Sequence, residues 1–209
     1  MVSNFLLFAF MCICLIILPG PDTAITTKNT LSFGKQGGFQ TLFGTCCALC
    51  VHTFAVIVGL SAIIVKSAIL FSIIKYAGAI YLIYLGIKTL LSIKQDMNSD
   101  MSEIKSSKGH SFFLQGFLTN LLNPKVAVFF LTFLPQFLNP AENSWSQFLI
   151  MGITYIVLTA IWFILYITLI QRINVFMKKP KTQKFIQGIT GAVLVGFAIK
   201  LAFEKAAFK

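Results

Sequence analysis

Two charged residues stand beside prolines within apolar stretches of the sequence. Asp22 follows Pro21 and is the only acid among the first 95 residues, and Lys125 follows Asn123 and Pro124. A lone charge in such a segment is energetically costly and usually functional. Asp22 could bind a substrate amine, carry a proton, or cap the helix that follows. Lys125 adds a full charge to a helix start, where backbone amides attract anions, so a substrate carboxylate could dock there. Lys125 could also be a counter-charge for Asp22 or extend to the membrane interface.

Other residues near these charges could complete a binding site. Gly20 and Thr23 flank the first charge, although threonine often bonds within its own helix. Asn120 and Asn123 carry amides in an apolar segment, and they could contact a substrate or satisfy carbonyls freed by a helix break. His52 could relay protons because the ordinary pKa of histidine is near neutrality, or it could form an interhelical hydrogen bond.

The composition indicates a membrane environment for these residues. Apolar residues make up 57% of the 209 positions, charged residues only 11%, and there are 22 phenylalanines. Soluble domains average about a quarter charged residues, so a water-soluble enzyme is not expected. Long unbroken apolar runs such as 5–18 indicate membrane helices rather than the alternating strands of a barrel. The net charge of +11 is typical of lysines at the cytoplasmic ends of spans. No nucleic-acid partner is predicted, because no basic patch has interleaved aromatic residues.

Hydropathy predicts one all-α integral membrane domain over 1–209. Six spans are expected, at about 4–21 with a continuation to 33, 39–64, 69–91, 112–138, 146–171 and 184–205. The first apolar run ends at Pro19-Gly20-Pro21, and the fourth contains Asn120 and Pro124. Because proline removes a backbone donor and clashes with the preceding turn, both spans are predicted to be broken helices. The polar stretch at about 92–111 is interpreted as a cytoplasmic linker.

The two halves of the chain show weak internal similarity. A proline followed by a charge occurs at 21–22 and 124–125, and a Gly-Ala pair followed by a lysine occurs at 78–88 and 191–200. Gly-Ala pairs are also common in packed membrane helices. Two halves of three spans must have opposite orientations, which is the inverted-repeat plan of many secondary transporters. The predicted repeats are residues 1–91 and 112–209, with approximate boundaries.

Lysine and arginine positions predict the orientation. With both termini outside, the inner side carries 11 basic residues and the outer side carries 5. An excess of basic residues in short loops marks the cytoplasmic side. Three lysines near the C-terminus, at 200, 205 and 209, run against this otherwise consistent pattern.

The cysteines support an alternative function. They are Cys12, Cys14, Cys46, Cys47 and Cys50. Cys46 and Cys50 share a helix face near His52 and could bind a soft metal, so a heavy-metal ion exporter that also uses Asp22 is an alternative. An intramembrane thiol carrier is a second rival. Cysteine also packs as a small hydrophobe, and no resident metal, cofactor or disulfide framework is expected. No phosphate-binding loop motif is present in the sequence.

Four motifs occur in order along the chain. They are LPGPD at 18–22, GAIYLIYLG at 78–86, GFLTNLLNPK at 116–125 and FLPQF at 133–137. In order and spacing they closely resemble the LysE/RhtB family of amino-acid exporters over nearly the whole chain. Members are small proteins of the bacterial inner membrane that expel amino acids such as basic amino acids, homoserine, threonine or leucine. The resemblance implies a secondary transporter, not an enzyme, that exports amino acids or close derivatives. The cysteine cluster departs from the family pattern.

Both charges have a role in the predicted mechanism. The carboxylate of a zwitterionic amino acid meets Asn123–Lys125, its ammonium meets Asp22, and the two repeats rock to open outward. A proton then displaces the ammonium at Asp22, so proton antiport is expected; one proton crossing 100 mV supplies about 2.3 kcal/mol. The predicted partners are the amino-acid substrate, protons and the lipid bilayer, and a homo-oligomer is compatible with the sequence.

Overall fold

The computed structural model describes four stretches of the chain and a few single positions. The described residues are 2, 4–66, 111–139, 142–170, 179–203 and isolated positions between 73 and 91. Every regular element in these stretches is helical, which confirms the all-α class for the described part. The predicted third span at 69–91 and the linker at 92–111 fall almost wholly outside the described residues.

The first break separates α1 (Phe5–Ile17) from α2 (Pro21–Lys66), as the sequence predicted. Leu18 leaves helical geometry after α1. Pro21 then opens α2, at a position where its missing N–H has no helical partner to lose. A helix of 13 residues is about 20 Å long, so α1 alone is too short to cross a bilayer core of about 30 Å.

A sharp turn divides α2 at Gly34. Its φ of 71° and ψ of −173° lie in a region that suits glycine and strains other residues. The predicted spans left 34–38 between helices, but the chain turns at this single glycine. Gly37 and Gly38 are buried within the helix that follows. A Cβ on Gly38 would come within 3.1 Å of the Ile167 side chain, so this glycine permits close packing.

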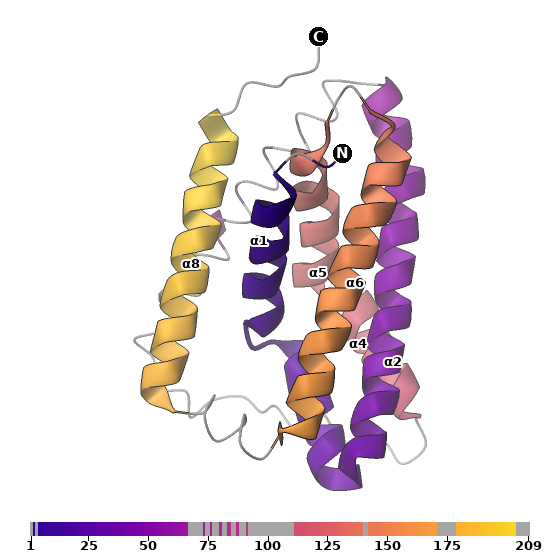
Figure 1. Cartoon of the computed structure of the whole chain (residues 1–209), viewed down its shortest axis with the longest axis vertical. Helices are drawn as coiled ribbons and strands as arrows, with labels where there is room; N and C mark the ends of the chain where they lie inside the picture. The colour runs from indigo at the N-terminus through magenta and orange to yellow at the C-terminus, as the bar shows by residue number, and fades with distance from the viewer. Residues whose placement is uncertain are drawn as a thin grey trace.

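The second break separates α4 (Phe112–Leu121) from α5 (Pro124–Val128). The chain continues through the π-helical turn η2 (Phe129–Phe133) and the 3₁₀ turn η3 (Leu134–Phe137). The two parts of this segment are bent by 49°. In Figure 1, α1 and the first part of α2 run in the opposite direction to α4 and α5.

Two long helices complete the described bundle. They are α6 (Ser144–Thr168) and α8 (Pro180–Phe203). By length and hydropathy, Pro21–Gly59 and Ser144–Thr168 could each cross a membrane, and the bent pair could form a third span. The described part is therefore an all-helical membrane protein with two or three clear spans. The start of α1 and the end of α8 lie at the same end of the bundle (Figure 1).

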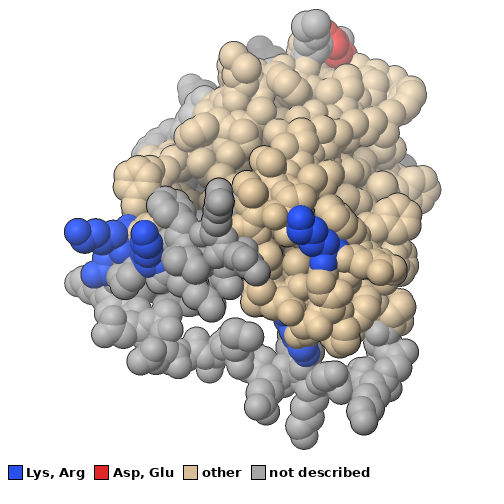
Figure 2. Space-filling model, turned by 60° about the horizontal axis from the view of Figure 1, so that its bottom comes forward, with Lys and Arg blue, Asp and Glu red and all other residues tan. Residues whose placement is uncertain are grey.

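The opposite end of the bundle is basic. Figure 2 shows lysine atoms gathered on the face that comes forward, which is the lower end of Figure 1. The described lysines at this end are Lys28 and Lys35, near the turn in α2, and Lys179, Lys181 and Lys184, near the start of α8. Glu142, by contrast, lies just before α6 begins, at the end shared with the start of α1.

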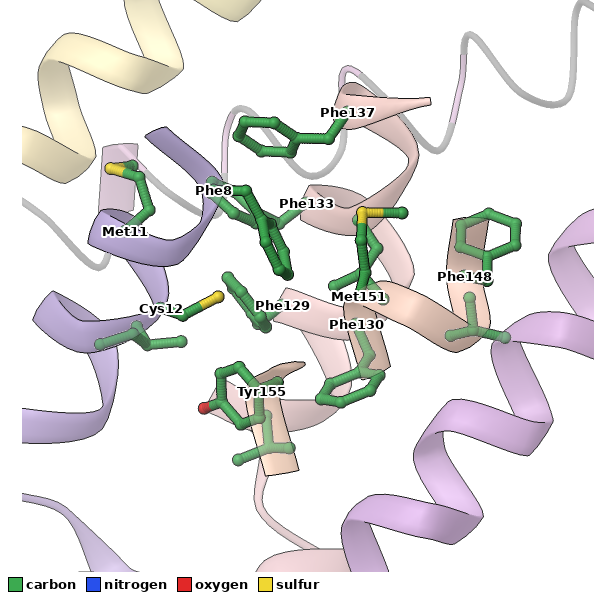
Figure 3. Packing of buried hydrophobic residues seen from close by; sticks show 14 of the residues in the cluster. Phe8, Met11, Cys12, Phe129, Phe130, Phe133, Phe137, Phe148, Met151 and Tyr155 are labelled. Carbon is green, nitrogen blue, oxygen red and sulfur yellow. The ribbon is translucent and has the colours of Figure 1, made fainter. Parts of the chain in front are cut away.

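An aromatic cluster fills the core between α1, α5 to η3, and α6 (Figure 3). Its members are Phe8, Phe129, Phe130, Phe133, Phe137 and Tyr155. Ring centroids of Phe129 and Phe133 are 4.5 Å apart, and those of Phe8 and Phe137 are 5.3 Å apart. Such contacts add to the stabilisation from burial alone. The cluster fixes α1 against the segment that follows the second break.

Small residues bring α2 very close to α4 and α6. A Cβ on Gly44 would collide with the backbone carbonyl of Phe113, and one on Gly116 with that of Thr41. A Cβ on Gly152 of α6 would collide with the side chain of Thr53 in α2. Glycine at such contacts lets membrane helices approach to backbone distance. These contacts bring α4 and α6 against the same helix and set the position of the second break.

Candidate functional site

A small cavity lies where the two helix breaks meet. Five of the predicted site residues line it. They are Gly20, Asp22, Thr23, Asn120 and Lys125. The space open to the centre of a water-sized sphere is about 20 Å³, which is enough for about one water molecule. The cavity in this structure is therefore small.

Asp22 is a buried acid with one oxygen left unpaired. Its side chain is only 8% exposed. Oδ2 accepts a hydrogen bond of 2.8 Å from Asn123 Nδ2, and Oδ1 has no hydrogen-bond partner. Asp22 lies in the first turn of α2, where a negative charge is favourable, so the structure is compatible with the helix-capping alternative as well. Buried polar atoms are almost always paired, so this free oxygen is unusual and is available to a ligand of the cavity.

Lys125 contacts the end of α1 rather than Asp22. Its ammonium donates to the carbonyls of Leu15 and Leu18, at 3.4 Å and 3.3 Å. The last carbonyls of a helix lack helical partners, and a cation is favourable near them. Among the described residues, Lys125 forms no direct ion pair with Asp22, but the two opposite charges line one cavity and interact electrostatically, as the counter-charge alternative expects.

Gly20 makes room for this lysine. A Cβ on Gly20 would lie 3.1 Å from Lys125 Nζ, closer than an ordinary van der Waals contact. A larger residue would therefore push the ammonium away from the carbonyls of α1. Thr23, one residue beyond Asp22, also lines the cavity.

Asn123 connects the two breaks. Its Oδ1 accepts a hydrogen bond of 3.0 Å from the backbone N–H of Lys125 and so caps α5. Its Nδ2 donates to Asp22, at the start of α2. Asn123 does not line the cavity itself, but its two hydrogen bonds join the starts of α2 and α5, where the two charges lie.

Asn120 and His52 contact each other through the backbone carbonyl of Asn120. Asn120 is 2% exposed, lines the cavity, and has an Oδ1 atom with no hydrogen-bond partner. His52 Nε2 lies 3.3 Å from the backbone carbonyl of Asn120. His52 does not line the cavity, so its contact fits the predicted interhelical hydrogen bond.

The two prolines of the predicted site are exposed. Pro21 and Pro124 each open a helix after a break, and neither lines the cavity. Each places a charge at the second position of the helix that it begins. The prolines therefore shape the backbone at the two breaks, where Asp22 and Lys125 come together.

Three polar residues of the cavity were missed by the sequence analysis. Thr45 comes from the second part of α2, and Tyr155 and Thr159 come from α6. Thr45 Oγ1 and Thr159 Oγ1 are buried without a hydrogen-bond partner. Tyr155 also belongs to the aromatic cluster, with its ring 5.0 Å from that of Phe129. The spacing of Tyr155 and Thr159, four residues apart on one face of an apolar helix, is a signal that could have identified them.

Hydrogen bonds close the bundle between the cavity and the basic end. Thr27 Oγ1 and Tyr166 Oη are 2.6 Å apart, which joins α2 to α6. Asn29 Nδ2 donates to Thr41 Oγ1 at 2.9 Å and to Gln115 Oε1 at 3.3 Å. These contacts, called here the polar contacts, lie opposite the aromatic cluster. The cavity therefore lies between the aromatic cluster on one side and these hydrogen-bonded contacts on the other.

The cysteine positions give the metal alternative no support. Cys46 is partly buried, Cys50 is exposed, and neither lines the cavity. In the part of the chain that the structure describes, no group of three or more His, Cys, Asp or Glu residues could hold a metal ion.

Comparison with known proteins identifies the family. A model described as LysE type translocator matches residues 13–205. The uncharacterized membrane protein YrhP of Bacillus subtilis is 40% identical over 193 residues, or 89% of this chain and 92% of its own. A homoserine/homoserine lactone efflux protein of Salmonella typhi is 33% identical over 177 residues, or 85% of each chain. No solved structure gives a significant match. The chain belongs to the LysE type translocator family, as its motifs indicated, and is a membrane translocator.

Proposed function

We propose that this protein is a secondary active exporter of small amino acids or close derivatives across the bacterial inner membrane. The observation that carries the proposal is the pair of opposite charges in one cavity. Asp22 and Lys125 both line it, and they do not pair with each other. A zwitterionic amino acid brings the complementary ammonium and carboxylate.

The substrate is placed by these two charges. Its ammonium binds the free Oδ1 of Asp22, and its carboxylate replaces the carbonyls of Leu15 and Leu18 as the acceptor for Lys125. Charge-assisted hydrogen bonds are stronger than neutral ones, so this exchange favours the bound amino acid. The name of the Salmonella typhi relative makes homoserine the first substrate to test.

Alternating access follows from two inverted repeats of three spans. The two broken helix pairs support this arrangement, since each has a proline at the start of its second helix and the pairs run in opposite directions (Figure 1). The basic end of the bundle is cytoplasmic, and the ends of α1 and α8 that lie together are outside. Because the closed cavity holds only about one water molecule, the substrate enters when the polar contacts separate.

Proton antiport drives export. After the amino acid leaves on the outer side, a proton binds Asp22 and is carried inward. One proton crossing 100 mV supplies about 2.3 kcal/mol. The acid then alternates between a proton and a substrate ammonium, which couples the two movements.

The test uses inverted membrane vesicles from a bacterial host that expresses this chain. Uptake of labelled homoserine into these vesicles corresponds to export, and it is measured with and without an imposed proton gradient. Asp22→Asn should abolish gradient-driven uptake while the protein remains in the membrane. Glu142→Gln, at an exposed acid outside the site, is the matched control and should transport normally. Normal uptake by Asp22→Asn, with an unchanged response to the gradient, would refute the proposal.

A further inference from the structure

Two threonines that line the cavity have hydroxyls without a hydrogen-bond partner. Thr45 is 2% exposed and Thr159 is 4% exposed, and both line the cavity. Their Oγ1 atoms are buried and unpaired. A buried hydroxyl usually has a partner, so two of them in one small cavity require an explanation.

Other threonines of the described helices satisfy their hydroxyls within their own helix. They donate to the carbonyl four residues earlier, a common arrangement for threonine in helices. These residues are Thr27, Thr30, Thr41, Thr53, Thr132, Thr154 and Thr168. Thr45 and Thr159 stand in the same kinds of helix without this bond. Their hydroxyls are therefore free to bond a group inside the cavity.

The polar groups of the cavity come from two kinds of helix segment. The charges of Asp22 and Lys125 come from the starts of the helices that follow the two breaks. The free hydroxyls come from uninterrupted stretches of α2 and α6. Tyr155 lies one turn before Thr159 on the same face of α6 and closes this part of the cavity toward the aromatic cluster.

We infer that Thr45 and Thr159 form a subsite that binds a hydroxyl group on the side chain of the exported amino acid. This inference rests on the proposed function, in which Asp22 and Lys125 hold the ammonium and the carboxylate. With the two charges occupied in that way, the unpaired polar atoms left around the cavity are the two threonine hydroxyls and Oδ1 of Asn120, and the side chain of the substrate is directed to them. A hydroxyl can donate to one threonine and accept from the other, because each hydroxyl is both donor and acceptor.

The subsite should discriminate by hydrogen bonding. A hydroxylated side chain pairs both threonines, whereas an aliphatic side chain of similar size leaves them unpaired. Sites built to bond a hydroxyl reject analogues that lack it for this reason. A cationic side chain finds no second acid, because Asp22 is the only acid among the described residues that line the cavity.

Homoserine and 2-aminobutyrate test the subsite, because they share a four-carbon skeleton and differ by the hydroxyl. Uptake of each is measured in inverted vesicles for the starting protein, Thr45→Val and Thr159→Val. Valine nearly preserves the shape of threonine and removes the hydroxyl. We expect either change to lower the ratio of homoserine to 2-aminobutyrate transport about tenfold, roughly the contribution of one hydrogen bond. Thr154→Val is the matched control, since its hydroxyl bonds Ile150 within α6, and it should keep the ratio.

The outcomes separate this inference from the proposed function. If Thr45→Val and Thr159→Val transport with an unchanged ratio, the subsite is refuted and the exporter proposal stands. If the starting protein moves neither compound, nor any other amino acid, both fail. Thr159→Ser covers the case in which a valine variant does not insert into the membrane. It keeps the hydroxyl and should keep the ratio; a tenfold loss of the ratio in the serine variant would overturn the assignment.

Discussion

The hydrogen bond between Asn123 and Asp22 can be isolated by mutation. Asn123→Ala removes two contacts, the cap on the Lys125 N–H and the bond to Asp22 Oδ2. Loss of a helix cap costs about 1 kcal/mol, and loss of a hydrogen bond to a charged group costs about 1.5–3 kcal/mol. We expect Asn123→Ala to lower the free energy of unfolding by about 2.5–4 kcal/mol.

The chain provides a matched control for the cap. Asn143 caps α6 by the same type of bond, because its Oδ1 accepts from the Trp145 N–H at 3.2 Å, and it lies on the exposed surface. Asn143→Ala should therefore cost only about 1 kcal/mol. Unfolding of purified protein by titration with SDS, followed by circular dichroism, compares the two variants.

A double-mutant cycle completes this experiment. In an Asp22→Ala background, Asn123→Ala should cost only its cap, about 1 kcal/mol. The coupling between the two positions should then be about 1.5–3 kcal/mol. Equal losses for Asn123→Ala and Asn143→Ala, together with a coupling near zero, would show that the bond to Asp22 does not hold the two breaks together.

Two further predictions concern packing and the cysteines. Gly44→Ala should destabilise the fold by at least about 1–3 kcal/mol, because its Cβ would collide with the Phe113 carbonyl; Gly59→Ala in the same helix has open space around it and should be neutral or slightly stabilising. Thermal unfolding in detergent measures both, and equal melting temperatures would contradict the close contact between α2 and α4. Cys46→Ala combined with Cys50→Ala should leave the cadmium resistance of expressing cells unchanged, since the described residues contain no metal-binding group; loss of an existing resistance would restore the metal-exporter alternative.

Local signals made the two breaks predictable from the sequence. Pro21 and Pro124 cannot continue a preceding helix, and each is followed by a charge, which is unusual in an apolar segment. The meeting of Asp22 and Lys125 in one cavity follows from breaks at similar depth in two antiparallel segments. The two breaks were predictable because the effect of proline on the backbone can be read from the residue type alone.

The rest of the cavity depends on how the helices pack. Thr45 and Thr159 lie in unbroken apolar helices, where threonine is ordinary, and only the structure shows that their hydroxyls lack partners. The single-residue turn at Gly34 was also missed, because several glycines stand close together and the sequence does not say which has the positive φ. Packing decides this point, since Gly38 is needed against Ile167.

In the proposed transport cycle, the two kinds of contact on either side of the cavity would make opening sensitive to temperature. Separating the aromatic cluster hydrates rings such as Phe8 and Phe133, which raises the heat capacity of the opened form. Separating the polar contacts exchanges protein hydrogen bonds for bonds to water, with little net change in free energy. Apolar association weakens on cooling. In that cycle, one form opens at the aromatic cluster and the other opens at the polar contacts. The aromatic cluster, which includes Phe8 and Phe133, would weaken on cooling, whereas the polar contacts around Asn29 would weaken much less. The relative populations of the two open forms would therefore shift with temperature.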